Sequence, residues 1–470
     1  MNTLKASSLI LLTVDNKIVL QLRDDDPHIH FSGKWGLIGG ASNINETPRS
    51  CMLRECFEET QWIPKFIIKL FVITEHCEET VYFSVVDDIT ALKCIEGKEL
   101  RAFEIAEINS INISSYHKFI INKFLNCKRC NRNISEISIL FYTKLLDNAF
   151  GGYITAGQSI YRLLSKHCNV TLVTERMIDQ ISDTNRHYDL LVFNGTYEKT
   201  DSFKKLRRIC NQVWCYEHNN INTENQAEML SRFVSSDRII VPSLFLNKLI
   251  LPFTIENTAL SPSVLPIPID ESVFLYAPLT FSNTVKFCTF CAIKSIRRLE
   301  DNILIIKSLR ERGYNCYYHI YGDIPFNGDV EYKNRICKLI SDLDLTNCIS
   351  IFKPVFSQKE IACLMKQYHF YLDLSAKETY GQAKLEALFS GLGLIMPFTE
   401  NNVNLVPNDY DFYSGTIADV ADKVAKRIDN FCRFPIEENK CRENARSFAI
   451  NQYSDTAVWS IMENMYYEFI

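Results

Sequence analysis

The chain lacks a long apolar run. No part of its 470 residues approaches the about 18 uninterrupted apolar residues that a membrane-crossing helix needs. The short apolar run at 9–14 is followed by no small-residue cleavage site, and Asp15-Asn16-Lys17 predicts a hairpin turn into a strand at 18–22. Without an export signal, the 17 cysteines indicate reduced thiols. We therefore expect a cytoplasmic protein.

An excess of one charge sign is also absent. The 51 Lys and Arg and the 56 Asp and Glu give a formal net charge of −5, and the two signs are interspersed. This balance creates no field that favours nucleic acid, so we expect no nucleic-acid partner. A chain of 470 residues is too long for one hydrophobic core, and we expect two or three domains.

The first quarter of the chain carries a set of spaced glutamates. Residues 40–59 read GASNINETPRSCMLRECFEE, which has the spacing G-x5-E-x7-R-E-U-x-E-E. A helix beginning near Thr47 would place Glu55, Glu58 and Glu59 on one face, because residues three and four apart are neighbours on a helix. Such carboxylates suit a hard cation like Mg²⁺, which a substrate diphosphate would help to coordinate. The alternative is an ordinary solvated helix, because Glu is a good helix former.

This spacing resembles the Nudix box. The resemblance implies that residues 1–126 form an α/β/α sandwich that cleaves a nucleoside diphosphate derivative with Mg²⁺ or Mn²⁺. It implies catalytic roles for Glu58 and Glu59, and a metal site made by the carbonyl of Gly40 with the carboxylates of Glu55, Glu58 and Glu59.

Other residues around the motif extend the resemblance. Arg54 and Glu46 would form a structural pair, and a further catalytic glutamate would be Glu96 or Glu99. The chain departs from the family at Gln61, where a glycine usually ends the helix; Gln must find a right-handed or strained conformation there.

Past a helix at 115–125 and a polar linker at 126–133, the pattern changes. Short apolar runs then alternate with amphipathic segments, which predicts parallel strands joined by helices. Strands are expected near 137–142, 170–173, 190–193, 213–216 and 239–243, and again near 287–292, 317–321, 349–352 and 370–373. We expect two Rossmann-like domains, 135–270 and 271–470, facing each other across a cleft, with the last helix crossing back.

A second constellation lies in the later half. Residues 377–391 read KETYGQAKLEALFSG, follow an expected strand and open an expected helix, with Glu378 and Glu386 eight positions apart. Ligands of open α/β sheets bind at the carboxyl ends of strands, and Gly381 permits close approach of a diphosphate to the helix N-terminus. The alternative for both glutamates is an ordinary helix surface.

The segment resembles the Glu-x7-Glu motif of retaining GT-B glycosyltransferases of the family 4 type. Further matches are Gly151-Gly152 before a helix, Val241-Pro242-Ser243, Pro266-Ile267-Pro268-Ile269-Asp270 and Tyr321-Gly322-Asp323. The resemblance implies a catalytic Glu378 at the donor sugar, Glu386 at the ribose and a cleft histidine at His218. It also implies donor-binding roles for Gly151, Gly152 and Gly381, and it assigns Lys294 and Arg298 to neutralise the diphosphate, so that no metal is needed there.

These readings combine into one hypothesis: a Nudix hydrolase fused to a glycosyltransferase that moves a sugar from a nucleotide-sugar to an acceptor hydroxyl in surface-polysaccharide assembly. The acceptor is a saccharide or a lipid-linked saccharide, and peripheral association with a membrane stays open. A second hypothesis makes the Nudix unit a nucleotide sensor that cuts nothing. A third makes both folds interaction surfaces. The donor's base and sugar, the acceptor and the oligomeric state are not determined by the sequence.

Overall fold

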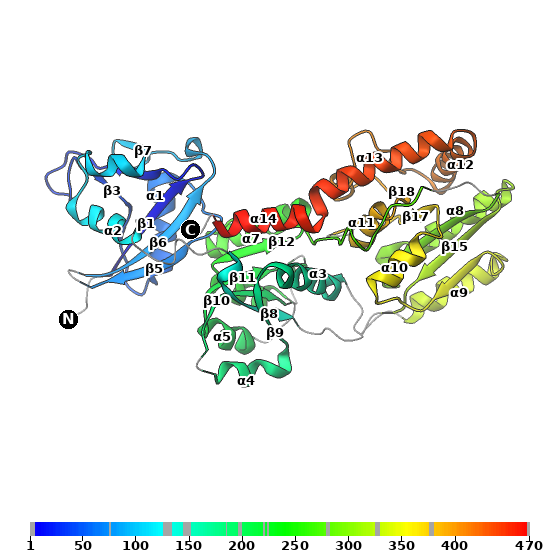
Figure 1. The fold of residues 1–470 in the computed structure, drawn as a ribbon, viewed down its shortest axis with the longest axis horizontal. Coiled ribbons are helices and arrows are strands. Elements are labelled where there is room, and N and C mark those ends of the chain that lie inside the picture. The colour runs from blue at the N-terminus through cyan, green and yellow to red at the C-terminus, as the bar shows by residue number, and fades with distance from the viewer. Residues whose placement is uncertain are drawn as a thin grey trace.

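The protein is described by a computed structural model over residues 5–74, 77–125, 134–143, 152–184, 186–195, 200–219, 221–222, 225–278, 283–324, 330–375 and 380–467. These residues form three β-sheets, and Figure 1 shows the three units in a row along an elongated molecule. The expected mixed α/β class is confirmed, with a sandwich followed by two parallel sheets. In the described ranges, no helix combines the length and apolar character needed to cross a membrane.

The first unit is a mixed seven-stranded sheet with one helix on each face. Its order is β3-β2-β1-β6-β5, with β4 beside β1 and β7 beside β2, and β1 runs parallel to β6. Alternate residues of β1 point to opposite faces, so that Leu9 is buried with Met52 of α1 and Ile10 with Ile120 of α2. The elements are β1 (Lys5–Thr13), β2 (Ile18–Leu22), β3 (Trp35–Gly36), β4 (Ile38–Ala41), α1 (Pro48–Thr60), β5 (Ile68–Ile73), β6 (Glu78–Val86), β7 (Glu99–Phe103) and α2 (Ser115–Leu125), with 3₁₀ turns at Ile89–Ala91 and Ile105–Asn109.

The second unit is a parallel sheet of six strands in the order β13-β12-β11-β10-β8-β9. The strand predicted at 239–243 ends at Val241 because Pro242 has no N–H to donate. The elements are β8 (Ser138–Thr143), α3 (Gly152–His167), β9 (Asn169–Val173), α4 (Ile178–Ser182), β10 (Tyr188–Asn194), α5 (Thr200–Arg208), β11 (Cys210–Tyr216), α6 (Gln226–Val234), β12 (Arg238–Val241), α7 (Leu244–Thr258) and β13 (Ser263–Val264), with 3₁₀ turns at Ile134–Glu136 and Glu175–Met177.

The third unit is a parallel sheet of five strands in the order β16-β15-β14-β17-β18. Its elements are β14 (Val285–Phe290), α8 (Leu299–Glu311), β15 (Cys316–Tyr321), α9 (Val330–Asp342), β16 (Ile349–Phe352), α10 (Gln358–Met365), β17 (Phe370–Leu372), α11 (Gln382–Phe389), β18 (Gly393–Ile395), α12 (Ile417–Arg433) and α13 (Pro435–Tyr453), with 3₁₀ turns at Ser295–Arg297 and Asn402–Asn404. In both parallel sheets the chain leaves one central strand in one direction and later returns to its other side. The carboxyl ends of β8 and β10, and of β14 and β17, are therefore the places where ligands of such sheets bind.

The chain returns from the third unit to the second at its end (Figure 1). The Ile269 N–H donates to the Tyr453 carbonyl at 2.8 Å, and Ile269 forms a parallel bridge with Ser454. Helix α14 (Asp455–Tyr467) then lies on α3, where the rings of His167 and Trp459 stack with centroids 4.0 Å apart. Both segments that connect the two units thus run side by side.

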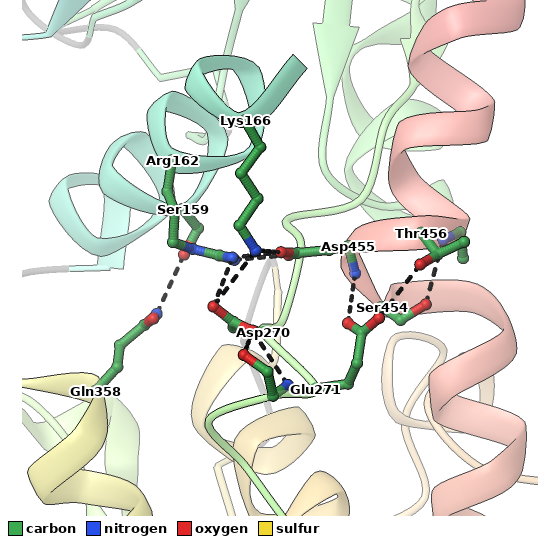
Figure 2. Close-up of polar contacts among 11 residues, drawn as sticks. Ser159, Arg162, Lys166, Asp270, Glu271, Gln358, Ser454, Asp455 and Thr456 are labelled. Carbon is green, nitrogen blue, oxygen red and sulfur yellow. Dashed lines mark hydrogen bonds and ion pairs between the residues drawn. The ribbon is translucent and has the colours of Figure 1, made fainter.

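Two cations of α3 hold these connecting segments together, as Figure 2 shows. Arg162 bonds Asp270 through Nη1 at 2.8 Å and Asp455 through Nη2 at 2.7 Å. Lys166 adds a contact of 2.6 Å to Asp455. Gln358 of α10 donates to Ser159 of α3 at 3.3 Å, so the third unit contacts the same helix directly.

The first unit is joined to the second by a buried surface. Phe66 forms an antiparallel bridge with Arg238, whose guanidinium lies 4.3 Å from the Phe66 ring centroid and 5.4 Å from that of Trp214. Arg49 of α1 approaches Asp237 at 3.3 Å. The buried clusters of the two units are continuous, because residues of β1 and α1 belong to the same cluster as residues of β10 and β11.

Candidate functional sites

The acidic motif of the first unit lies on α1 and faces the loop before it. Thr47 caps the helix by accepting the Ser50 N–H at 3.1 Å, as the expected helix start requires. Glu59 is 3% exposed and accepts the Gly39 N–H at 3.1 Å. A side chain at Gly40 would come within 2.6 Å of the Glu55 carboxylate, so the glycine gives Glu55 its room.

Arg54 binds the neighbouring carboxylates. It forms the expected pair with Glu46, through Nε at 2.9 Å and Nη2 at 3.0 Å. Its Nη1 also lies 2.8 Å from a carboxylate oxygen of Glu55 and of Glu58. Glu58 is half-exposed, with 48% of its side chain accessible, whereas Glu55 and Glu59 face inward.

Burial and mutual repulsion shift the inward carboxylates. Burial is the main reason that the pKa of Glu59 is raised to about 8, and the charges of Glu55 and Glu96 also raise it. The hydrogen bond from the Gly39 N–H acts in the opposite direction and lowers this pKa. Burial also raises the pKa of Glu55, although Arg54 opposes the shift, and the charges of Glu58 and Glu96 again add to it. Of the two candidates for a further glutamate, Glu96 is the one whose charge acts on both Glu55 and Glu59.

The donor chemistry of this cluster fits a hard divalent cation. Buried carboxylates that repel one another are stabilised by a cation between them, and their oxygens are ligands that Mg²⁺ prefers. Within the described residues, no three His, Cys, Asp or Glu side chains are arranged to hold a metal ion. One reason is that the Arg54 guanidinium pairs with the carboxylates of Glu55 and Glu58. The carbonyl of Gly40 accepts the Cys51 thiol at 3.6 Å.

Gln61 ends α1 in the left-handed conformation, with φ 53° and ψ 20°. It therefore adopts the backbone that glycine usually supplies here, and its Nε2 donates to the Phe57 carbonyl at 3.3 Å.

We expect Gln61→Gly to raise the free energy of unfolding by about 0.5–1 kcal/mol, because glycine relieves left-handed strain. Urea unfolding would measure it. Gln61→Ala, which keeps the Cβ and loses the side-chain bond, should be the less stable variant, and the reverse order would contradict the assignment of strain.

The second candidate site is at the carboxyl ends of β14 and β17. Gly381 caps α11, and a Cβ there would lie 2.8 Å from the side chain of Leu405, which would have to move. Glu386 is 4% exposed, accepts one bond from Gln382 at 3.2 Å, and burial raises its pKa to about 8. A buried carboxylate with so little compensation, in the helix that follows β17, is typical of a ligand-binding site.

The two cations expected in this region, Lys294 and Arg298, are both exposed. Lys294 is exposed, and Arg298 pairs with Asp301 at 2.5 Å while its side chain is 50% exposed. Arg298 has φ 50°, and this left-handed turn leaves its neighbour Arg297 on the inward side, 3.6 Å from buried Asp373. The diphosphate roles of Lys294 and Arg298 stay predictions.

A buried lysine lies beside Asp373, as Arg297 does. Lys384 is 1% exposed and lies 3.5 Å from Asp373 and 3.1 Å from the amide oxygen of Asn402. The sequence contains signals for both missed cations: Arg297 is adjacent to Arg298, and Lys384 interrupts an apolar stretch of helix.

His218 follows β11 at the corresponding edge of the second sheet. It is 8% exposed, and burial lowers its pKa to about 3, so its ring is neutral. Gly152 is the first residue of α3. Two predicted site residues, Gly151 and Glu378, lie outside the described residues, as does the predicted linker at 126–133.

Comparison with known proteins supports two different units. Residues 3–119 match the family model of the NUDIX domain. No curated protein sequence matches the chain. Among solved structures, Anabaena HepE in complex with UDP and glucose is similar, with 16% identity and a TM-score of 0.55 over 70% of this chain and 100% of HepE.

A glycosyltransferase from Rickettsia africae is similar to the same degree. It has 16% identity and a TM-score of 0.55, over 71% of this chain and 98% of its own. These likenesses show the fold: after the N-terminal Nudix domain, the chain has the GT-B architecture of glycosyltransferases. The assignment to the family 4 type stays a prediction.

Proposed function

We propose that this chain is a retaining glycosyltransferase of the hexosyltransferase type, fused to a Nudix pyrophosphohydrolase. The transferase would move a sugar from a nucleoside diphosphate sugar to a hydroxyl of a saccharide or lipid-linked acceptor, in the cytoplasm and for polysaccharide assembly. The observation that supports the proposal is Glu386 of α11, whose buried carboxylate lowers the stability of the protein without a ligand. The bound UDP and glucose of HepE support a donor of this class.

Different residues of the third unit would bind different parts of the nucleotide-sugar. Glu386 would accept hydrogen bonds from the two ribose hydroxyls, and Gly381 would let the diphosphate approach the first N–H groups of α11. Glu378 would contact the donor sugar. Guanidinium or ammonium groups near this end of the sheet would stabilise the charge that the departing diphosphate gains.

The hydrolase would use the cluster on α1. Glu55, Glu58 and Glu59 would hold Mg²⁺ or Mn²⁺, and Glu58 or Glu59 would take a proton from the attacking water. When bound, such a cation polarises a phosphate oxygen and lowers the pKa of a coordinated water. Arg54 pairs with both Glu55 and Glu58, so these contacts must loosen before the two carboxylates can bind a cation.

The same contacts of Arg54 favour a second candidate function for the first unit. With Glu55 and Glu58 held by a cation of the chain itself, the unit would bind a nucleotide and regulate the transferase without cutting. This function keeps the transferase proposal unchanged.

Chelation separates these activities. We expect EDTA to abolish diphosphate cleavage across a panel of nucleoside diphosphate sugars and to leave sugar transfer in place, because only the first site depends on a cation. Product analysis by chromatography would follow both reactions in one sample. Glu58→Gln should reproduce the effect of EDTA. Absence of any cleavage in the untreated protein would favour the sensor, and loss of transfer with EDTA would contradict the metal-free transferase site.

A further inference from the structure

A chain of polar side chains crosses the carboxyl edge of the second sheet. Thr143 and Asn194 are the last residues of β8 and β10, and His218 lies two residues past the end of β11. These strands are neighbours in the order β11-β10-β8. Thr143 and Asn194 are fully buried, so their hydrogen bonds are made within the protein, whereas His218 is 8% exposed.

The bonds of Asn194 fix the state of the His218 ring. The Asn194 amide nitrogen donates to the Thr143 hydroxyl at 3.4 Å, which turns the amide oxygen toward His218 Nε2 at 2.6 Å. An amide oxygen can only accept, so Nε2 must carry the proton of the neutral imidazole. Nδ1 then has a lone pair and acts as a hydrogen-bond acceptor.

The surrounding packing leaves the amide little freedom to rotate. A Cβ at Gly157 of α3 would lie 2.4 Å from the Asn194 amide nitrogen and 3.0 Å from the Thr143 hydroxyl. Tyr216 contacts the His218 ring edge-on, with centroids 4.5 Å apart. Glu217, paired with Arg232, accepts the His218 N–H at 3.0 Å and holds the backbone.

We infer that Asn194 is a positioning residue of the transferase: it holds His218 in the tautomer whose Nδ1 accepts a hydrogen bond from a sugar hydroxyl. The inference rests on the proposed function, and it adds to it the state in which His218 acts. The hydroxyl belongs either to the donor sugar or to the saccharide acceptor, and both offer the same O–H donor. His218 in this state binds and orients a hydroxyl; it is not a cationic acid.

The tautomer can be measured without any substrate. Nitrogen-15 spectra of the histidine side chains should include a ring with a protonated Nε2 and a bare Nδ1 that is missing in His218→Gln. This variant separates the His218 signal from those of His117 and His369, whose Nδ1 atoms also accept backbone N–H groups. A proton on Nδ1 of His218 would overturn the inference. Because this readout needs no turnover, it stays decisive even if no nucleotide-sugar is consumed and the proposed function fails.

Substitution of Asn194 gives a functional readout. Asn194→Asp keeps an acceptor at Nε2 and adds a negative charge, which raises the pKa of His218 from about 3 and favours protonation of both ring nitrogens. Transfer should then be low at acidic pH and recover as the pH rises through the new pKa. Asn194→Ala should lower kcat/KM about tenfold with no new pH step. A merely structural role would give Asn194→Asp the pH profile of the wild type, and that result would refute the proposal.

Gly157→Ala tests the same residue from the other side. The added methyl must displace the Asn194 amide, so we expect the His218 signal to shift and kcat/KM to fall although no polar group is removed. An unchanged spectrum would contradict the role of Asn194. The affected constant identifies the hydroxyl: a higher KM for the nucleotide-sugar in its hydrolysis without acceptor indicates the donor, and a higher KM for the acceptor alone indicates the acceptor.

Discussion

Replacing Glu386 with glutamine should lower sugar transfer about 10- to 100-fold in kcat/KM while making the free protein more stable at pH 8 to 9. At a pH above about 8, where the Glu386 carboxyl is ionised, the loss corresponds to about 1.5–3 kcal/mol for hydrogen bonds to a charged group, because the amide keeps one acceptor oxygen where the carboxylate has two. The gain in stability has a separate origin, in the burial that raises the pKa of this carboxyl from 4.5 to about 8.

The sign of the pH effect follows from proton uptake. Between pH 4.5 and 8 the folded protein keeps a proton on Glu386 that the unfolded chain has lost, so the free energy of unfolding decreases as the pH rises across this range. Glutamine does not titrate and removes this dependence. The difference in Tm between Glu386→Gln and wild type should therefore be small near pH 5 and grow up to pH 8 or 9, as thermal unfolding at a series of pH values would show.

Glu59→Gln provides the matched control. Burial raises the pKa of Glu59 to about 8 as well, so the difference in Tm between Glu59→Gln and wild type should also grow with pH. It lies in the other unit and should leave sugar transfer unchanged while removing diphosphate cleavage. If Glu386→Gln instead transferred sugar as the wild type does, the carboxylate would not be the ribose ligand.

The helices and strands that depend on local sequence patterns were predicted best. Helix α2 has the predicted bounds, Ser115–Leu125, and β16 lies at the predicted 349–352, because amphipathic spacing and short apolar runs are properties of adjacent residues. The Arg54–Glu46 pair, which the resemblance to the Nudix box implied, is present as well. The fold class followed from the alternation of such segments.

The arrangement of the sites depended on contacts that adjacent residues do not determine. The choice between Arg297 and Arg298 is made by the left-handed backbone at Arg298, which turns only one of them toward Asp373. The partner of His218 is Asn194, which is distant in sequence and adjacent only once β10 and β11 pair. Spacing identified the motifs, whereas strand order and backbone turns decided which side chains meet.

Removing Asp237 should cost about 3–5 kcal/mol, because its loss leaves buried positive charge without a partner. Asp237 has 8% of its side chain exposed and lies 3.3 Å from Arg49 of α1 and 3.4 Å from Arg207, and it also accepts the Val213 N–H at 2.8 Å. Asp237→Ala would remove this partner from Arg49 and from the Val213 N–H at the surface between the first and second units, whereas Arg207 would keep its bonds to the carbonyls of Ser235 and Cys210. Asp87→Ala is the control, because the Lys65–Asp87 pair is 43% and 57% exposed and should contribute less than about 1 kcal/mol.

The way in which Asp237→Ala unfolds decides whether the Nudix domain is a tethered module or a structural part of the transferase. Arg49 lies in the first turn of α1 and the acidic cluster lies further along the same helix, while Asp237 directly precedes β12. The shared core and the Phe66–Arg238 contact make one cooperative transition the expected result, with both activities lost at the same lowered temperature. Calorimetry would show it. Two separate transitions, with transfer surviving the first, would mean that the hydrolase unfolds alone. In the cooperative case, Arg49→Met combined with Asp237→Leu should restore part of the stability, because it removes the unpaired charge of Arg49 while Arg207 keeps its bonds to the carbonyls of Ser235 and Cys210.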